Sequence, residues 1–259
     1  MMRVQAEYER IMTHPLASNT VNVLDMDRAG QLATVRSHLD ADPQRHLRAR
    51  VSTGCVAGIE DHELLELVLS RVVAQSIAGD LAQRLIRVFG DFNKVVAAPP
   101  ARLLTIAGVT AEIVAEVKLV ESCAHRMVRA RISDKPVLSG WQALLDYCHT
   151  VMAHRQTEQF RVLFLDRKNR LIADEAMGEG TVDHVPVYPR EVVRRALELN
   201  ATALILVHNH PSGDPRPSDA DIAMTRQIRQ AAEALSLILH DHLIIGSSSE
   251  VSLRAEGVL

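Results

Sequence analysis

Two histidines, a serine and an aspartate stand close together in the C-terminal half of the sequence. His208-Asn209-His210 is followed, after a loop with three prolines and a glycine, by Ser218 and Asp221. In extended backbone, residues i and i+2 point to the same side, so two imidazoles with Cα atoms about 7 Å apart can converge on one ion. Two histidines and a carboxylate are zinc ligands, and a three-ligand set leaves the open fourth position typical of catalytic zinc. The spacing therefore predicts one catalytic zinc ion per chain.

The same residues also fit a purely structural pattern. Ser218 and Asp221 have the spacing of a capping box, in which the N-cap residue and the third helical residue satisfy each other's backbone groups. The His-x-His spacing also recurs, at His240-Asp241-His242, in a chain with 12 histidines. The metal interpretation depends on the combination of two histidines at a strand end, a rigid loop and an acidic residue in the first turn of a helix.

Length and composition narrow the class of protein. The 259 residues suffice for one large domain or two modest ones, and a hydrophobic fraction of 47% with only 3% aromatics predicts an aliphatic core. A formal net charge of −3 argues against attraction of nucleic acid by the whole surface. Three widely spaced cysteines without a CxxC pair indicate a reducing compartment. The sequence has neither an apolar run of membrane-spanning length nor the apolar region of a signal peptide. We expect a cytoplasmic protein with no membrane partner.

The first half of the chain divides into an irregular N-terminus and a helical domain. Residues 1–57 show no sustained hydrophobic period, although short helices at Val4–Met12 and Arg28–Leu39 fit the pattern. Residues 58–131 predict a compact all-helical domain with short turns, followed by a linker up to Pro136. The expected helices start near Glu60 and cover Ser76–Phe89, Asp91–Ala97, Pro100–Thr105 and a long segment that ends at about Arg131.

Residues 137–259 predict an α/β domain that positions the candidate ligands. The expected strands are Gln159–Leu165, Arg170–Met177, Ala203–Val207, Leu237–Ile245 and Val251–Leu253, and the expected helices are Gly140–His154, Arg190–Asn200 and Asp219–Leu235. The short, partly β-branched run before His208 is typical of a buried strand. Its end should hold both histidines, and the last of these helices should hold Asp221 in its first turn.

The spacing of His208, His210, Ser218 and Asp221 matches the JAMM motif of MPN/JAB-domain metalloproteases. The wider string HNHPSGDPRPS at 208–218 resembles the bacterial RadC proteins specifically. The resemblance runs from about Gly58 to Gly246 and is strongest at 158–246. It implies a C-terminal MPN/JAB (JAMM, cytidine-deaminase-like) α/β domain, preceded by an all-α helix-hairpin-helix-like domain. It also implies zinc as the cofactor and a peptide or protein as the substrate.

The resemblance further implies a catalytic glutamate on an early strand, and Glu158 stands at the matching place. In JAMM proteins this residue is the general base that takes a proton from the attacking water and delivers it to the leaving amine. The family role of Ser218 is to donate a hydrogen bond to the developing oxyanion. The other upstream glutamates remain alternatives: Glu175, Glu179, Glu191 and Glu198.

The remaining histidines of the domain receive lesser roles. Asp241 and His242 also resemble a RadC strand motif, and we interpret them as supporting or structural residues, because a fourth protein ligand would close the site. His184 and His240 are interpreted as ordinary structural histidines.

In RadC proteins the helical segment is helix-hairpin-helix-like, a unit that binds the DNA backbone through amides of a glycine-rich hairpin and a helix N-terminus. Here the hairpin is residues 106–110, and Gly108 and Thr110 are the candidate nucleic-acid contacts. Thr110 stands where the family usually has a second glycine, so a Cβ occupies the place of close backbone approach. Arg126, Arg129 and Arg131 cluster after the hairpin. DNA binding and a purely structural bundle both remain open for this segment.

Two functions follow from these observations. The first is a zinc-dependent JAMM-type peptidase or isopeptidase. The alternative is a DNA-repair-associated protein in which the helical segment binds DNA and the metal site is accessory. A zinc nucleobase deaminase is excluded, because that chemistry needs HxE with PCxxC and this sequence has no CxxC.

Overall fold

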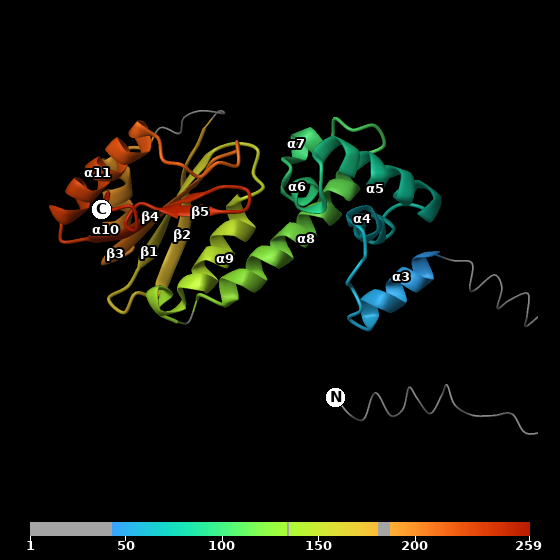
Figure 1. The fold of residues 1–259 in the computed structure, drawn as a ribbon, viewed down its shortest axis with the longest axis horizontal. Helices are drawn as coiled ribbons and strands as arrows, with labels where there is room; N and C mark the ends of the chain where they lie inside the picture. Colours follow the sequence, from blue (N-terminus) through green and yellow to red (C-terminus); the bar gives the residue numbers. More distant parts are fainter. Residues whose placement is uncertain (1–42, 134, 181–186) are drawn as a thin grey trace, which may run out of the picture. The chain divides into compact units, whose positions relative to one another are not determined.

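The computed structural model describes residues 43–133, 135–180 and 187–259 (Figure 1). Contacts between Cα atoms divide the chain into two units, residues 1–58 and 59–259. The described part of the first unit holds one helix, α3 (Pro43–Ser52), which the sequence does not predict because few of its residues are apolar. The helices predicted at Val4–Met12 and Arg28–Leu39 lie outside the described residues, as does His184.

The second unit begins with a helical segment. It contains α4 (Asp61–Leu69), α5 (Gln75–Phe89), α6 (Phe92–Ala97), α7 (Pro100–Leu103) and α8 (Ala111–Ala130). Local chemistry sets the helix ends: Gly90 adopts a φ of 107° after α5, and the Asp91 carboxylate accepts a hydrogen bond of 2.8 Å from the Lys94 amide at the start of α6. Leucine, valine and isoleucine side chains fill the core between these helices. The helical prediction for this segment is confirmed.

A mixed five-stranded sheet with helices on both faces forms the rest of the described unit (Figure 1). Its strands are β1 (Gln159–Leu165), β2 (Leu171–Glu179), β3 (Ala203–Asn209), β4 (Ile238–Ile245) and β5 (Glu250–Ser252). They lie in the order β2-β1-β3-β4-β5, and β3 and β4 are the pair that runs parallel. The helices are α9 (Trp141–Met152), α10 (Pro189–Glu198) and α11 (Asp219–Glu233), with a short 3₁₀ turn, η1 (Val137–Gly140), before α9. The predicted α/β character is confirmed.

Alternate residues of the central strands enter two separate cores, one on each face of the sheet. Ile205 and Val207 pack with α9, whereas Leu204 and Leu206 pack with α10 and α11. Figure 1 shows α9 and the end of α8 on one side of the strands and α10 and α11 on the other. His208 continues the alternation of Leu204 and Leu206, so its side chain belongs to the α10–α11 face.

The predicted boundaries differ most where polar residues continue a regular element. β3 runs two residues beyond the apolar run, to Asn209, because its ladder with β4 includes His208 and Asn209. The division predicted between residues 58–131 and 137–259 lies inside the second unit and stays a prediction. No described helix has the length and apolar content needed to cross a membrane.

Candidate metal centre

The two histidines of the motif are held at the end of β3 by the parallel ladder. His208 pairs with Ile244 in register, and the ladder is extended beyond the strand by a 2.9 Å hydrogen bond from the His210 amide to the Ile245 carbonyl. Both residues therefore keep extended backbone, and their imidazoles point to the same side, as expected. The His208 ring is fully buried and stacks on the Phe160 ring of β1 at 6.2 Å between centroids.

Ser218 and Asp221 form the start of α11. Ser218 is the N-cap, and its hydroxyl and the Asp221 amide are 3.2 Å apart, while the Asp221 Oδ2 accepts hydrogen bonds from the Ser218 amide (2.8 Å) and hydroxyl (2.6 Å). The capping box is therefore present. It binds Oδ2 and leaves the other carboxylate oxygen, Oδ1, facing His208. Capping thus orients the carboxylate, so the structural and metal-binding interpretations are compatible.

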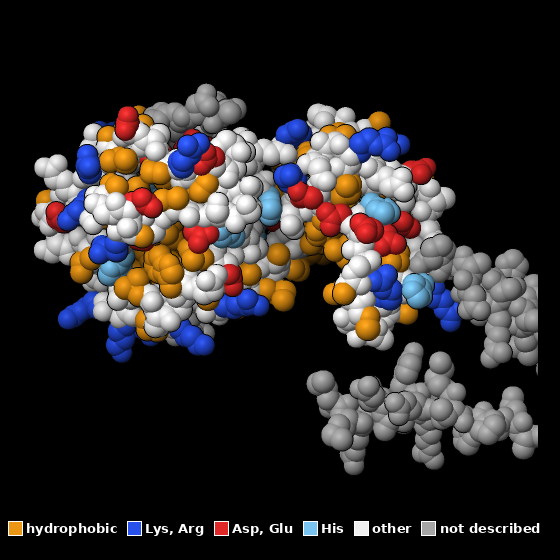
Figure 2. Space-filling model, in the orientation of Figure 1, with side chains coloured by type: hydrophobic (Ala, Val, Ile, Leu, Met, Phe, Trp, Pro, Cys, Tyr) orange, Lys and Arg blue, Asp and Glu red, His pale blue; other side chains and the backbone are white. Residues whose placement is uncertain are grey.

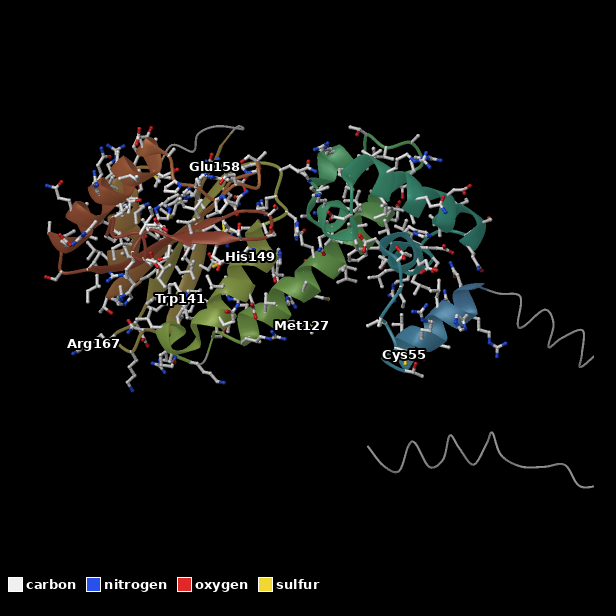
Figure 3. All side chains as sticks on the ribbon, viewed as in Figure 1. Cys55, Met127, Trp141, His149, Glu158 and Arg167 are labelled. Carbon is white, nitrogen blue, oxygen red and sulfur yellow. The ribbon has the colours of Figure 1, made fainter. Side chains whose placement is uncertain are left out.

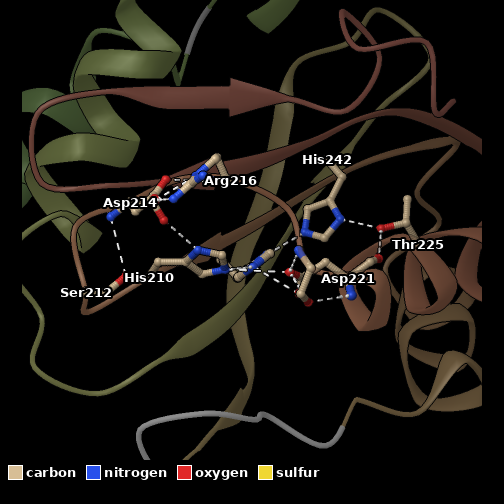
Figure 4. Close-up of polar contacts among 9 residues, drawn as sticks. His210, Ser212, Asp214, Arg216, Asp221, Thr225 and His242 are labelled. Atoms are coloured by element: carbon tan, nitrogen blue, oxygen red, sulfur yellow. Dashed lines mark hydrogen bonds and ion pairs between the residues drawn. The ribbon is translucent and has the colours of Figure 1, made fainter.

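Three ligand-type atoms converge between the strand end and the helix start (Figure 4). The Nε2 atoms of His208 and His210 are 3.0 Å apart, and the Asp221 Oδ1 lies 3.2 Å from Nε2 of His208. Oδ2 of Asp221 is 3.6 Å from Nε2 of His210. Bonds of about 2.0–2.1 Å to a tetrahedral zinc ion require ligand atoms about 3.3 Å apart. The cluster matches that spacing and can hold a metal ion.

A chain of hydrogen bonds sets which nitrogen of His208 carries its proton. The Thr225 hydroxyl donates to the Asp221 carbonyl (2.6 Å), so its oxygen must accept from Nδ1 of His242 (2.5 Å). Burial lowers the pKa of His242 well below its usual value, so this ring is neutral and its Nε2 can only accept. That Nε2 is 2.8 Å from Nδ1 of His208, which must then donate. The lone pair of His208 is left on Nε2.

His210 reaches the same state through a different partner. Its Nδ1 is 2.8 Å from the Asp214 carbonyl, which can only accept, so Nδ1 carries the proton and Nε2 carries the lone pair. Two nitrogen lone pairs and a carboxylate oxygen thus face one another without a donor among them. A cation placed among these acceptors would satisfy all three, and the donor set fits a divalent metal.

The pKa shifts of two of these groups describe the alternative to metal binding, in which protons on the histidine Nε2 atoms face the Asp221 carboxylate. Burial alone would raise the pKa of the Asp221 carboxyl, but hydrogen bonds from His208, His210 and Ser218 outweigh burial and hold it far below its usual range. The hydrogen bond to Asp221 raises the pKa of His210 above its usual value. The Glu158 carboxylate contributes to the same increase, so it lies within electrostatic reach of His210.

The loop between the two parts of the motif is held by a close contact with the turn after β4. Gly213 has a φ of 87°, and its carbonyl accepts a hydrogen bond from the Ser247 amide at 3.2 Å. A Cβ on Gly246 would lie 2.4 Å from the Gly213 carbonyl oxygen, so only glycine fits there. This contact fixes the carbonyl of Asp214 where it binds His210.

Glu158 stands immediately before β1, at the same edge of the sheet as the histidines. β1 and β3 are antiparallel with Phe160 opposite His208, so continuing the register places Glu158 opposite His210. Figure 3 shows Glu158 at the end of β1 opposite to Arg167 in the β1–β2 turn. The other glutamates named above are engaged elsewhere: Glu175 and Glu198 pair with Arg195, Glu191 with Arg194, and Glu179 with Arg155. Glu158 is the one whose position fits the cluster.

Asn209 holds the segment that carries Glu158, a role that the sequence analysis missed. The buried Asn209 side chain accepts a hydrogen bond from the Gln159 amide (2.9 Å) and donates one to the Thr157 carbonyl (3.2 Å). It therefore binds the backbone on both sides of Glu158. The available signal is that a residue between two same-facing strand residues points to the opposite, buried face, where an amide needs partners. Thr225 was also missed, and only the fold brings it to His242.

The second His-x-His pattern does not form a ligand pair. A register shift in β4 leaves His240 without a partner on β3, and its Nε2 instead bonds Asn169 at 2.8 Å. Asp241 is structural: its carboxylate accepts hydrogen bonds from the His242 and Arg254 amides and from the Ser252 hydroxyl. His242 alone reaches the cluster, through His208.

The candidate nucleic-acid contacts lie in the turn between α7 and α8. Gly108 has a φ of 90°, Thr110 is the N-cap of α8, and Arg84 donates a 2.6 Å hydrogen bond to the Ala107 carbonyl. Glu112 places a carboxylate in the first turn of α8, which disfavours a phosphate at the same amides. Figure 2 shows both acidic and basic side chains on the visible face of this segment. Nucleic-acid binding at Gly108 and Thr110 stays a prediction.

Comparison with known proteins connects this region to a family. A family model described as a RadC-like JAB domain matches residues 138–258. A UPF0758 protein of Rhodobacter capsulatus is 66% identical over 213 residues, which cover 82% of this chain and 100% of that protein. A UPF0758 protein of Ruegeria pomeroyi is 61% identical over 218 residues, which cover 84% and 97%. Since both the domain and nearly the whole length of these relatives match, the chain belongs to the RadC family.

Proposed function

We propose that the chain is a zinc-dependent hydrolase of the JAMM type that cleaves peptide or isopeptide bonds. The observation that carries the proposal is the convergence of His208 Nε2, His210 Nε2 and Asp221 Oδ1, with the other nitrogen of each histidine already occupied. Three such ligands suit a catalytic zinc ion with an open position. The match to a JAB domain supports the same class.

The chain supplies residues for each part of the reaction. When bound, zinc would polarise the scissile carbonyl and lower the pKa of water at the site. Glu158 is placed to act as general base toward the attacking water and then as general acid toward the leaving amine. Its position opposite His210 and the Asn209 hydrogen bonds on both sides of it support this role.

Ser218 has two tasks in the proposal. Its amide hydrogen bond of 2.8 Å to Oδ2 can hold the Asp221 carboxylate without the hydroxyl. The hydroxyl, which donates to the same oxygen at 2.6 Å, can then turn to the oxyanion that develops on the substrate. The hairpin at Gly108 and Thr110 does not enter this proposal, because the carboxylate of Glu112 opposes an anion there.

The first experiment measures metal content. Purified wild-type protein, loaded with zinc and passed through gel filtration, should hold about one ion per chain by mass spectrometry. His208→Ala and Asp221→Ala should hold background zinc while remaining folded by circular dichroism. If wild type retains no more zinc than these variants, the proposed metal site is wrong.

The second experiment tests the hydrolase. The zinc-loaded protein is incubated with a peptide library and a set of isopeptide-linked peptides, alongside Glu158→Gln and the matched control Glu191→Gln. Loss of the base should lower turnover by about 10²–10⁴-fold, while Glu191→Gln should leave it unchanged, because Glu191 pairs with Arg194 on α10. Equal turnover in wild type and Glu158→Gln would dismiss Glu158 as the base, and no cleavage by the zinc-loaded wild type would dismiss the hydrolase.

A further inference from the structure

A surface cavity of about 240 Å³ lies between the C-terminal half of α8, α9 and β1. Its lining residues are His125, Arg126, Arg129, Tyr147, Val151, Arg155 and Arg161. We refer to it as the arginine cleft. Val128, between two of these residues on α8, packs into the same core as α9, so this part of α8 and the sheet share one interior. The walls of the cleft are thus held in place by this shared core.

The guanidinium groups in the arginine cleft exceed the carboxylates that neutralise them. Arg161 pairs with the buried Asp174 at 2.9 Å, and Arg155 pairs with the exposed Glu179 at 3.3 Å. Arg126 and Arg129 are exposed and make no ion pair with any residue that the structure describes. Both oxygens of Asp174 are engaged, since the second accepts a hydrogen bond from the Tyr147 hydroxyl. The cleft therefore keeps a net positive charge.

Two further observations concern the hydrogen bonding and the charge around the cleft. The Nε of Arg155 is buried and has no hydrogen-bond partner among the described residues, which is a costly state for a charged donor. Burial lowers the pKa of His125, the Glu121 carboxylate and a hydrogen bond with the Thr150 backbone oppose this effect, and Arg155 and Arg161 lower the pKa further. The shift of His125 is thus due mainly to burial, and the two arginines add to it.

We propose that the arginine cleft binds phosphate groups. Guanidinium groups recognise phosphate through paired hydrogen bonds, and four of them line this one cavity. The volume of about 240 Å³ corresponds to roughly eight water molecules, enough for one or two phosphates. A single-stranded nucleic acid and a free phosphorylated molecule offer the same chemistry.

The arginine cleft is separate from the metal centre and does not depend on it. Phe160 stacks on His208 on the α10–α11 face, whereas the next residue of β1, Arg161, faces the α9 side. Ligand binding in the cleft therefore goes beyond the proposed hydrolase, and either proposal can fail without the other.

The test uses the full-length, zinc-loaded protein and a pair of matched double variants. R126Q/R129Q removes two unpaired positive charges from the cleft, and R167Q/K168Q removes two from the exposed β1–β2 turn. Binding of a fluorescein-labelled ten-residue oligothymidylate is followed by anisotropy at low salt. Binding of inorganic pyrophosphate is followed by calorimetry. Circular dichroism and zinc content check that all proteins are folded and loaded alike.

We expect R126Q/R129Q to weaken binding by about tenfold or more, and R167Q/K168Q to stay within about twofold of wild type. If the oligonucleotide is the probe that binds, loss of two phosphate contacts should also reduce the slope of log K against log salt by about 1.4. If pyrophosphate alone binds, the cleft takes a free phosphorylated molecule. The proposal is overturned if neither probe binds, or if the two double variants weaken binding equally. If phosphate instead binds at the metal centre, R126Q/R129Q will bind it as tightly as wild type. This result would also overturn the proposal.

Discussion

Two histidines separated by one residue stand at the end of β3, and two more stand within the neighbouring strand β4, and the structure uses the two pairs differently. On β3 the ladder stays regular through His208, so both imidazoles point to the same side and meet Asp221. On β4 a bulge at His240 removes that residue from the ladder, and only His242 approaches the cluster. In this protein, the His-x-His spacing brings two imidazoles together where the backbone remains extended and regular, and not where it is bulged.

The largest expected difference between the two patterns is in metal affinity. His210→Ala should lower zinc affinity by about a hundredfold or more, because it removes one of three ligands. His240→Ala, the matched change in the second pattern, should leave the affinity unchanged, because this ring binds Asn169. Titration against a fluorescent chelator measures both. Equal losses would show that the bulged pattern also takes part in metal binding.

A smaller effect on zinc affinity is expected at His242, the residue of the second His-x-His pattern that contacts His208 of the first. Thr225→Val removes the acceptor of the His242 Nδ1 proton, so His242 is no longer held in the tautomer whose Nε2 accepts from His208 and keeps the His208 lone pair on Nε2. Zinc affinity should fall by about 10–100-fold, as for other residues that orient metal ligands.

Thr150→Val is the control for this change. The Thr150 hydroxyl makes the same helical hydrogen bond, to the Asp146 carbonyl at 2.8 Å, and lies on α9, on the other face of the sheet from the metal cluster. Its zinc affinity should equal that of wild type. An unchanged affinity in Thr225→Val as well would contradict the hydrogen-bond chain described above.

The smallest expected effects distinguish Asn209 and Asp241, the middle residues of the two His-x-His patterns. Asn209→Ala should lower turnover by about tenfold with zinc retained, because Glu158 loses the hydrogen bonds that hold its flanking backbone. Asp241→Ala should leave turnover unchanged but lower the free energy of unfolding by roughly 1–3 kcal/mol for each donor left unpaired. Turnover at a temperature where both variants are folded, together with urea unfolding, distinguishes the two. Identical profiles would mean that Asn209 is structural only.

Much of the fold was predictable because the hydrophobic periodicity agrees with the residues that mark helix and strand ends. The sequence predicts β1 with its observed bounds, and Gly90 and Pro189 mark helix ends where the structure has them. β3 was predicted two residues short, since the apolar signal stops where the polar ligands begin. Helix α3 was missed because a polar helix leaves almost no pattern.

The site was predictable only in part, because some of its residues are placed by local sequence pattern and others by contacts between distant segments. The metal cluster follows from strand alternation plus a helix start, which are both local. Asn209, Thr225 and the arginine cleft depend on the approach of distant segments, as in the hydrogen bond between Thr225 and His242 or the cavity that Arg129 and Arg161 both line. No spacing in the sequence encodes these contacts.

The contact between Gly213 and Gly246 has a consequence for mutational scanning. A saturation library read out by function will show Gly246 as intolerant as the histidines, although it carries no reactive group, because any side chain there would meet a carbonyl oxygen at 2.4 Å. Intolerance at such a position measures available space and not chemistry. A map of essential residues drawn from such a library will therefore extend from the strand end into the neighbouring turn and make the reactive area look larger than it is.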